Sequence, residues 1–360
     1  MREAFSEARL GRGRTGSNPC VGAIVFKDGK IIGRGSHPGA GKPHAEPLAI
    51  AEAGELARGA DLYVSLEPCS HQGRTPPCVQ ALIDAGIHRV FFSCKDPNPK
   101  VSGNGERALK NAGIQVFSGL LEDEGKEILQ GWFCCLEENR SRVRVKAAMT
   151  LGGQMAPRSG DSRWITSELA RKKVHQIRNQ VSAVLVGAQT AIQDDPSLTI
   201  RDVSNQDNFQ PKAVLIDPNQ RVPVSRKIFR PETIVVTKEG SSSVWKDQMA
   251  EKEVSVIELP VCENQEFPLD KMLEELAQRD VQEILVEGGG RTIGAFLKQS
   301  LVDHFDLFYA PKILGPSGFS FAEGFECEFM NQAVEFEWTR LSTFSPDFLV
   351  EARVRSFQGS

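Results

Sequence analysis

The residues of this 360-residue sequence that are best suited to do chemistry lie between His37 and Cys78. This stretch contains His44-Ala45-Glu46, then Pro68-Cys69, then Pro77-Cys78. One imidazole and two thiolates can hold a zinc ion and leave its fourth position open for water, which distinguishes a catalytic zinc from a closed structural one. Bound zinc makes hydroxide available near neutral pH, and an adjacent carboxylate can then move protons.

The predicted elements bring these side chains together at the starts of two helices. Residues two apart on a regular helix do not share a face, so His44 and Glu46 can reach one centre only where a helix begins. Pro47 suits a first helical turn, and Cys78 follows prolines at a second helix start, where the helix dipole favours a thiolate. We therefore predict a zinc hydrolase that removes an amino group from a pyrimidine, with zinc on His44, Cys69 and Cys78 and Glu46 as the proton shuttle.

Other interpretations of the cluster stay open at this point. A structural zinc site, a non-catalytic zinc-stabilised interaction module and buried cysteines beside an unrelated histidine all fit the residue types. The gap of eight residues between Cys69 and Cys78 departs from the two-residue gap of the common deaminase signature. A base-editing enzyme that acts on nucleic acid is disfavoured, because the formal charge is −4 and the pI is about 6.0.

Composition sets the wider expectations. Hydrophobic residues make up 40% of the chain and charged residues 25%, which is ordinary for a globular protein. The eight cysteines are dispersed, Met1 to Leu10 resembles an amphipathic helix more than a signal peptide, and no apolar run approaches the length of a membrane span. We expect a cytoplasmic protein with neither a membrane nor a nucleic acid as partner.

Strand-like and helix-like segments alternate throughout the chain, which predicts an α/β fold. The polar stretch 137–141 divides it into two predicted domains, residues 1–141 and 142–360. In the first domain we expect strands over 21–26, 31–35, 62–66 and 90–93, and helices over 1–10, 47–53 and 78–85. In the second we expect strands over 142–147, 183–186, 213–216, 233–236 and 283–286, helices over 167–179, 269–278 and 292–299, and a loop over 202–210.

The spacing around Cys69 is itself a recognisable pattern. Residues 67–78, Glu-Pro-Cys-Ser-His-Gln-Gly-Arg-Thr-Pro-Pro-Cys, closely resemble the deaminase half of the bifunctional riboflavin-biosynthesis deaminase–reductase family. Residues 18–22, 35–38 and 44–46 match that family in the same order. The resemblance implies a cytidine-deaminase-like three-layer domain that hydrolyses the 2-amino group of a diaminopyrimidinone carrying a ribosylamino 5′-phosphate. It also implies substrate contacts that, taken singly, would suit ordinary turn or surface roles as well: Asn18, His37, Ser65, His71 and Arg74.

From Arg142 onward the sequence resembles the reductase half of the same family. The matching stretches are residues 146–151, 159–167, 194–196, 198–201 and 286–290, together with Thr190. The resemblance implies a dihydrofolate-reductase-like domain that uses NADPH to reduce the ribosyl group to ribityl by hydride delivery at C1 of the sugar. It implies substrate contacts through Ser162, Arg178, Leu198, Arg201 and Glu287. The implied NADPH site is lined by Ala148, Trp164, Thr190, Asp194, Gly289, Gly290, Arg291, Thr292, Ile293, Gly294 and Ala295.

The glycine triplet at 288–290 supports a phosphate site on physical grounds alone. A predicted strand runs into the triplet and then into a helix, whose N-terminus offers free N–H groups to an anion. A bare tight turn is the alternative for such a triplet.

One position departs from the family. Leu-Asp-Gly is usual where this chain has Leu151-Gly152-Gly153, so a carboxylate is missing beside the expected cofactor site. The main prediction is the bifunctional enzyme. The alternative is an active deaminase whose reductase domain is degenerate and serves structure or oligomerisation. The resemblance also predicts a homo-oligomer.

Overall fold

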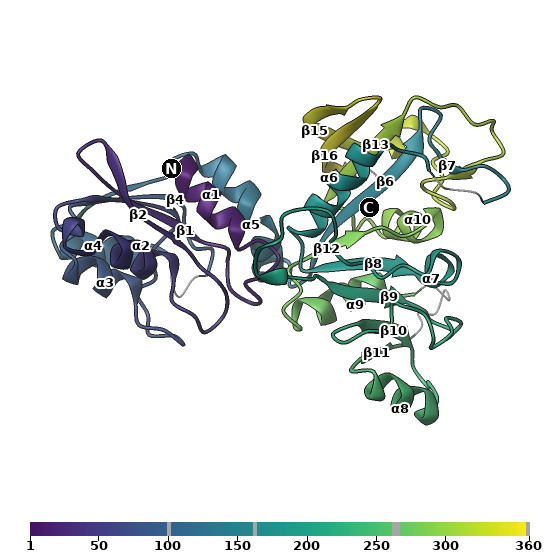
Figure 1. The fold of residues 1–360 in the computed structure, drawn as a ribbon, viewed down its shortest axis with the longest axis horizontal. Helices are drawn as coiled ribbons and strands as arrows, with labels where there is room; N and C mark the ends of the chain where they lie inside the picture. The colour runs from purple at the N-terminus through teal and green to yellow at the C-terminus, as the bar shows by residue number, and fades with distance from the viewer. Residues whose placement is uncertain (99–101, 161–163, 261–266, 358–360) are drawn as a thin grey trace. The chain divides into compact units, whose positions relative to one another are not determined.

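The computed structural model describes residues 1–98, 102–160, 164–260 and 267–357. It divides into two compact units, Met1–Asn139 and Arg140–Ser360, each with its own sheet. The predicted domain boundary, between residues 141 and 142, lies two residues farther along the chain. Both units combine helices with a sheet of mixed strand direction (Figure 1).

The first unit is built on one five-stranded sheet. Its strands are β1 (Gly22–Lys27), β2 (Lys30–Ser36), β3 (Asp61–Leu66), β4 (Arg89–Cys94) and β5 (Gln115–Ser118). The order is β2-β1-β3-β4-β5, with β1 antiparallel to both neighbours and β3, β4 and β5 parallel. The helices are α1 (Arg2–Leu10), α2 (Ala45–Ala53), α3 (Cys78–Asp84), α4 (Asn104–Asn111) and α5 (Glu122–Glu137), with a 3-10 turn at Gly54–Ala57.

Two glycines let helices lie directly on this sheet. A β-carbon on Gly22 would stand 2.1 Å from the carbonyl oxygen of Ala4 in α1, and one on Gly35 would stand 2.0 Å from that of Ala45 in α2. Gly35 pairs with Ala23 across β1 and β2, so Gly22 and Gly35 face opposite sides of the sheet. α1 and α2 therefore cover opposite faces, which gives three layers and fixes the first turn of α2 close to the sheet.

The second unit is built on a nine-stranded sheet. Its strands are β6 (Arg142–Thr150), β8 (Ala183–Gly187), β9 (Lys212–Ile216), β10 (Ile234–Lys238), β11 (Ser255–Leu259), β12 (Glu283–Val286), β13 (His304–Ala310), β15 (Val334–Phe344) and β16 (Asp347–Phe357). The order is β11-β10-β9-β8-β12-β6-β13-β16-β15. All strands from β11 to β13 in this order are parallel, and the β15–β16 hairpin continues the sheet antiparallel. β7 (Gln154–Ala156) and β14 (Phe319–Ser320) pair separately.

Each face of the nine-stranded sheet carries its own apolar core. Alternation along β8 places Leu185 in one core and Val184 and Val186 in the other. The first core packs on α9 (Leu269–Ala277) and α10 (Gly290–Lys298). The second packs on α6 (Glu168–Arg178), α7 (Ala188–Asp194) and α8 (Ser243–Glu251). β8 and β12 are continuous apolar runs because both of their faces are buried.

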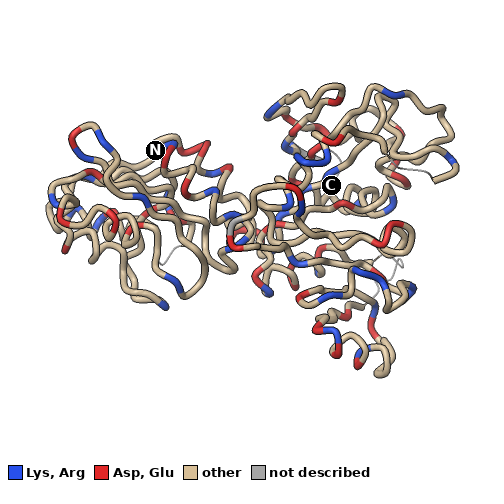
Figure 2. Tube along the Cα trace, viewed as in Figure 1, with Lys and Arg blue, Asp and Glu red and all other residues tan. Residues whose placement is uncertain are grey.

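Every strand and helix predicted above is present, with ends shifted by a few residues. The segment 202–210, expected to be a loop, contains a 3-10 turn at Gln206–Asn208, and a second such turn precedes β15 at Met330–Gln332. Lys and Arg are interspersed with Asp and Glu along both units (Figure 2). In the part of the chain that the structure describes, no helix is both long enough and apolar enough to cross a membrane.

Candidate zinc centre and reductase site

The three predicted zinc ligands meet where β3 ends and where α2 and α3 begin. His44 precedes α2, Cys69 follows β3, and Cys78 is the first residue of α3. Nδ1 of His44 lies 3.1 Å from Sγ of Cys78 and 3.5 Å from Sγ of Cys69. All three ligand atoms lie within 4.8 Å of one another, and no fourth His, Cys, Asp or Glu among the described residues belongs to the group. One imidazole and two sulfurs in this arrangement fit zinc.

The two cysteines of this group differ in acidity. A hydrogen bond from Cys78 lowers the pKa of Cys69 to about 4, and the backbone N–H of Cys78 donates to the Cys69 sulfur at 3.4 Å. The same side-chain interaction raises the pKa of Cys78. The sequence led us to expect the helix start to favour a thiolate at Cys78. Two adjacent sulfurs repel each other as a pair of anions, and the backbone N–H of Cys78 favours a negative charge on the Cys69 sulfur.

Glu46 lies in the first turn of α2 and is 3% exposed. Burial raises the pKa of its carboxyl to about 7, and the adjacent Cys69 thiolate adds to the shift. Its carboxyl interacts with the side chain of Cys78, so it borders the cluster without being one of the three ligands. A carboxyl whose pKa is near neutral can both take and return a proton, as a proton shuttle must.

Asn18 and His37 form a short hydrogen-bonded chain beside His44. The Asn18 amide donates to Nε2 of His37 at 3.0 Å, and Nδ1 of His37 donates to the carbonyl oxygen of Pro43 at 3.0 Å. The rings of His37 and His44 are 5.1 Å apart and nearly perpendicular. Burial lowers the pKa of His37, which favours the neutral ring. The structure thus brings these two predicted substrate contacts next to His44, a predicted zinc ligand.

The other predicted substrate contacts of the first unit are placed differently. Ser65 is fully buried in β3, and its hydroxyl accepts a hydrogen bond from the backbone N–H of Gly22 at 3.1 Å. His71 and Arg74 are exposed on the loop that joins Cys69 to Cys78. The loop therefore presents an imidazole and a cation near the cluster, whereas Ser65 ties β3 to β1. Contact of these three residues with a substrate stays a prediction.

Sequence reasoning missed Thr75, which lies on the same loop. Its hydroxyl is 3.2 Å from Nε2 of His44, on the opposite side of the ring from the sulfurs. When Nε2–H donates to this hydroxyl, Nδ1 is left unprotonated and free to bind a metal. The motif contained the residue, but only the folded loop shows which nitrogen it faces.

Replacing Thr75 with valine is expected to weaken zinc binding roughly tenfold to hundredfold, the size of effect known for partners of metal-ligating histidines. Competition with a chromogenic chelator measures this affinity without reference to activity. The Thr75→Ser variant keeps the hydroxyl and should bind zinc as the unaltered chain does. Equal zinc affinities of the valine and serine variants would contradict this role.

Sequence reasoning also missed two buried acids near the Cys69 loop. The Glu67 carboxylate accepts hydrogen bonds from the backbone N–H groups of Gly103 at 3.0 Å and Glu106 at 3.2 Å, at the start of α4. Asp96 follows β4 and accepts from the N–H of Asn98 at 2.8 Å, and burial raises its pKa. Glu67 therefore anchors the chain just before Cys69 to a helix that follows it by more than thirty residues.

In the second unit, Arg178 and Glu287 form a buried ion pair. Nε of Arg178 donates to Oε1 of Glu287 at 2.6 Å and Nη2 donates to Oε2 at 3.0 Å. The two side chains are 11% and 10% exposed. Although burial opposes ionisation, the charge of Arg178 lowers the pKa of Glu287 to about 2. Nη1 of Arg178 also donates to the carbonyl oxygen of Thr199 at 2.8 Å, which brings the predicted substrate loop to the pair.

The predicted phosphate turn lies between β12 and α10. Gly289 caps α10, and its N–H donates to Oγ1 of Thr190 at 3.1 Å, which joins two of the predicted NADPH contacts. The first N–H groups of a helix lack acceptors inside the helix. Arg291 is 80% exposed beside them and pairs with Glu323 at 2.9 Å. Backbone donors and a cation at a helix N-terminus suit a pyrophosphate, so these residues fit NADPH.

The remaining predicted contacts of the second unit lie on several different elements. Trp164 is 65% exposed, with the Arg171 guanidinium 4.3 Å above its ring. Asp194 is exposed at the end of α7, Ala148 is half-buried on β6, and Thr292 to Ala295 lie in α10.

The loop that carries Leu198 and Arg201 is held by local contacts. Leu198 is buried and has a left-handed backbone with φ of 54°. The backbone N–H of Arg201 donates to Nδ1 of His175 at 3.2 Å, and its guanidinium donates to the Ser197 hydroxyl at 3.4 Å. Ser162, the last predicted substrate contact, lies outside the described residues.

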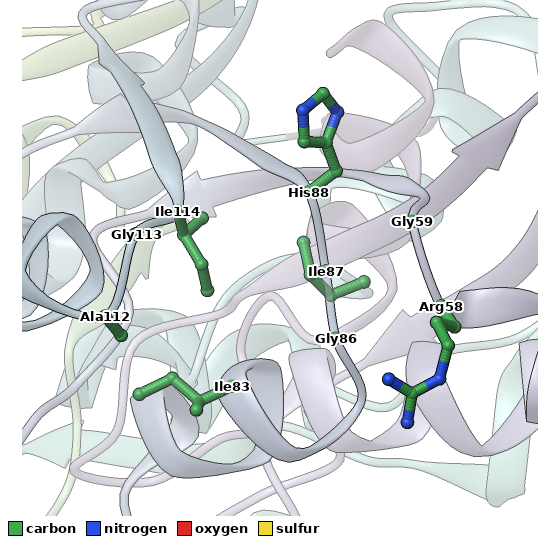
Figure 3. A pocket seen from close by; sticks show the side chains of 9 residues that line it. All are labelled: Arg58, Gly59, Ile83, Gly86, Ile87, His88, Ala112, Gly113 and Ile114. Carbon is green, nitrogen blue, oxygen red and sulfur yellow. The ribbon is translucent and has the colours of Figure 1, made fainter.

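Two further features carry no part of either site. A pocket of about 350 Å³ lies at the N-terminal ends of β3, β4 and β5, whereas the zinc cluster lies beyond the C-terminal end of β3. Figure 3 shows Ile83, Ile87 and Ile114 among its lining residues.

In the second unit, His304, Asp306 and Glu351 have metal-like spacing. Arg144 pairs with Asp306 and lies 3.7 Å from Glu351, so the carboxylates already face a cation.

Both halves of the chain match known families. The family model described as RibD C-terminal domain matches residues 141–350, and that described as cytidine and deoxycytidylate deaminase zinc-binding region matches residues 1–94. The chain is 45% identical over 318 residues to the riboflavin biosynthesis protein RibD of Aquifex aeolicus (strain VF5), covering 88% of this chain and 87% of that protein. It is 37% identical to the Escherichia coli (strain K12) RibD, with 96% of each chain covered.

Solved structures give the same result. An Acinetobacter baumannii RibD structure matches with a TM-score of 0.88 and 36% identity, covering 99% of this chain and 98% of that one. A Thermotoga maritima structure, described as a diaminohydroxyphosphoribosylaminopyrimidine deaminase/5-amino-6-(5-phosphoribosylamino)uracil reductase, matches with a TM-score of 0.84 and 37% identity, covering 98% and 97%.

Proposed function

This chain belongs to the RibD family and is a bifunctional deaminase and NADPH-dependent reductase of riboflavin biosynthesis, and from this premise we propose that the first unit performs the deamination and the second the reduction. The observation that carries the proposal is the group of His44, Cys69 and Cys78 with the buried Glu46 beside it. The predicted α/β fold class and the predicted cofactors, zinc and NADPH, are confirmed.

For the first step, we propose that water replaces the 2-amino group of the diaminopyrimidinone ribotide. When bound by His44, Cys69 and Cys78, zinc supplies Lewis-acid activation of the attacking water. Glu46 takes a proton from that water and delivers it to the amine, which leaves as ammonia. The proposed substrate contacts are Asn18 and His37 on the pyrimidine, Arg74 on the phosphate, and Ser65 and His71 at the site around Cys69.

For the second step, we propose that the ribosyl group is reduced to ribityl. NADPH, when bound, supplies the hydride for C1 of the sugar. The proposed NADPH contacts are Ala148, Trp164, Thr190, Asp194 and residues 289–295. The proposed substrate contacts are Ser162, Arg178, Leu198, Arg201 and Glu287. Glu287 holds the Arg178 guanidinium in one orientation, which pre-organises both groups for a polar substrate.

The alternative of a degenerate reductase domain has no specific support from the relatives. A β-carbon on Gly152 would stand 2.5 Å from Oε1 of Gln154, the movable end of a side chain. Because that side chain can turn away, the Gly152→Asp variant restores the carboxylate of the family without a backbone clash.

Mass analysis of the products tests both steps at once. The zinc-loaded chain is incubated with the diaminopyrimidinone ribotide, with and without NADPH. We expect exchange of an amino group for oxygen in both reactions and a further gain of two hydrogens only with NADPH. Ammonia release without NADPH oxidation would favour the alternative if the Gly152→Asp variant then oxidised NADPH. Absence of ammonia release would contradict the proposed deaminase.

We also propose that the enzyme works in the cytoplasm, as a homo-oligomer, on a small phosphorylated pyrimidine and not on nucleic acid or a membrane. Zinc binding needs Cys69 and Cys78 as thiolates, and a reducing compartment keeps cysteines available in that form. Lys and Arg are interspersed with Asp and Glu along the described parts of both units (Figure 2), and the net charge of −4 gives no electrostatic drive toward a polyanion.

A further inference from the structure

Lys312 lies just past the end of β13, where the chain turns sharply. Its backbone N–H donates to the carbonyl oxygen of Ala310 at 2.7 Å, a tight turn that ends the strand. β13 and β6 are parallel neighbours, and the last pair in their register is Ala310 with Thr150. Just beyond this pair, the N–H of Leu151 donates to the carbonyl oxygen of Lys312 at 3.0 Å. The backbone of Lys312 is therefore joined to the turn in which Gly152 replaces the family carboxylate.

The side chain of Lys312 reaches a second segment, 148 residues away in the sequence. Its Nζ donates to the carbonyl oxygen of Trp164 at 2.7 Å and to that of Ile165 at 2.9 Å. The next carbonyl oxygen, that of Thr166, accepts a hydrogen bond from Nη1 of Arg171 at 2.8 Å. Three consecutive carbonyl groups thus accept hydrogen bonds from cations, which are stronger than those from neutral donors. Because this segment belongs to no helix or strand, side chains hold it in place.

The tether determines where Trp164 presents its ring. The indole is 65% exposed, although tryptophan is on average a well-buried residue. The Arg171 guanidinium lies over the ring, 4.3 Å from its centroid, and adds a cation–π contact. A ring whose backbone is held at two carbonyl groups has little freedom left to lose when a ligand contacts it.

We infer that Lys312 is a positioning residue of the reductase site, which holds Trp164 where NADPH contacts it and links that contact to the Leu151 turn. The inference rests on the proposed NADPH contact of Trp164 and adds the group that places the ring. Lys312 acts through Trp164 and is assigned no contact of its own with the cofactor. A tether that served only to start α6 would leave the affinity for NADPH unchanged, whereas a positioning residue would not.

The dissociation constant of NADPH, measured by isothermal titration calorimetry on the full-length chain, tests the inference without turnover. Lys312→Met should raise this constant roughly tenfold, because binding must then also immobilise the Trp164 segment. Lys312→Arg keeps a cation with several N–H donors and should recover most of the affinity. The control is Lys252→Met, which removes an exposed ammonium group just after α8 and should leave the constant unchanged.

A double-variant cycle shows whether Lys312 acts through Trp164. Trp164→Leu should itself weaken NADPH binding. Adding Lys312→Met to it should cause little further loss, since the tether then has no ring to hold. Equal losses from Lys312→Met in the unaltered chain and in the Trp164→Leu variant would overturn the inference.

Hydrogen exchange of the protein without NADPH tests the tether separately from the cofactor. Peptides covering residues 164–171 should exchange faster in Lys312→Met. Peptides of β8 and β12 should keep their exchange rates, which shows that the second unit is folded. Unchanged exchange over 164–171 would contradict the tether. An unchanged dissociation constant for Trp164→Leu would instead contradict the proposed NADPH contact on which the inference depends.

Discussion

Replacing Glu46 with glutamine is expected to lower the rate of ammonia release by about a thousandfold, within the range of loss for a positioned general acid–base group. The amide has nearly the shape of the carboxyl but cannot take a proton from water or return it to the leaving amine. Zinc should stay bound, because Glu46 is not among the three residues whose ligand atoms form the metal group. Ammonia release and zinc content are measured on the same preparation.

A matched control lies on the same helix. The Glu52 carboxylate of α2 accepts a hydrogen bond from the backbone N–H of Arg34 at 2.9 Å, away from the cluster, so Glu52→Gln should leave ammonia release nearly unchanged. Reduction of the separately supplied deaminated intermediate should be normal in both variants. Full ammonia release by Glu46→Gln, or a loss that accompanies loss of zinc, would contradict the proposed role.

Replacing Arg178 with methionine is expected to destabilise the second unit by about 3–5 kcal/mol, since it removes the main counter-charge of a buried carboxylate, which Lys146 then compensates only in part. Glu287 is the charge left behind, and it is 10% exposed. Reduction should be lost as well, because Arg178 no longer orients Glu287 or the loop at Thr199. Hydrogen exchange of β6 and β12 peptides in increasing urea measures the stability of this unit separately from the first.

Two further variants show whether the effect of Arg178→Met comes from the burial of the pair or from the loss of one charge. Arg279→Met removes the exposed partner of the half-buried Glu275 in an i,i+4 pair and should change stability little. The double variant Arg178→Met with Glu287→Leu removes both charges of the pair and should regain part of the stability without regaining reduction, because Lys146 loses its neighbouring carboxylate. Ammonia release should persist in all these variants. If the Arg178→Met enzyme is stable and still reduces its substrate, the ion pair is required neither for stability nor for reduction.

The sequence by itself predicted the metal ligands, the proton shuttle and most of the elements that hold them. His44 with Glu46, and Cys69 with Cys78, are short-range patterns whose residue types and flanking prolines specify both chemistry and local backbone. The apolar runs of β8 and β12 are likewise visible in sequence, because burial on both faces leaves a local signature. Family resemblance then added the second site as a set of residues without a geometry.

The tertiary structure alone decided how those residues meet. Arg178 and Glu287 are 109 residues apart, and their pairing depends on where α6 and β12 lie in the nine-stranded sheet. Thr75 and Glu67 contact groups that the folded loop or a later helix brings to them, and the backbone N–H of Cys78 reaches the Cys69 sulfur only in the folded loop. Local patterns encode residue type and periodicity, whereas strand order and register fix which distant side chains become neighbours.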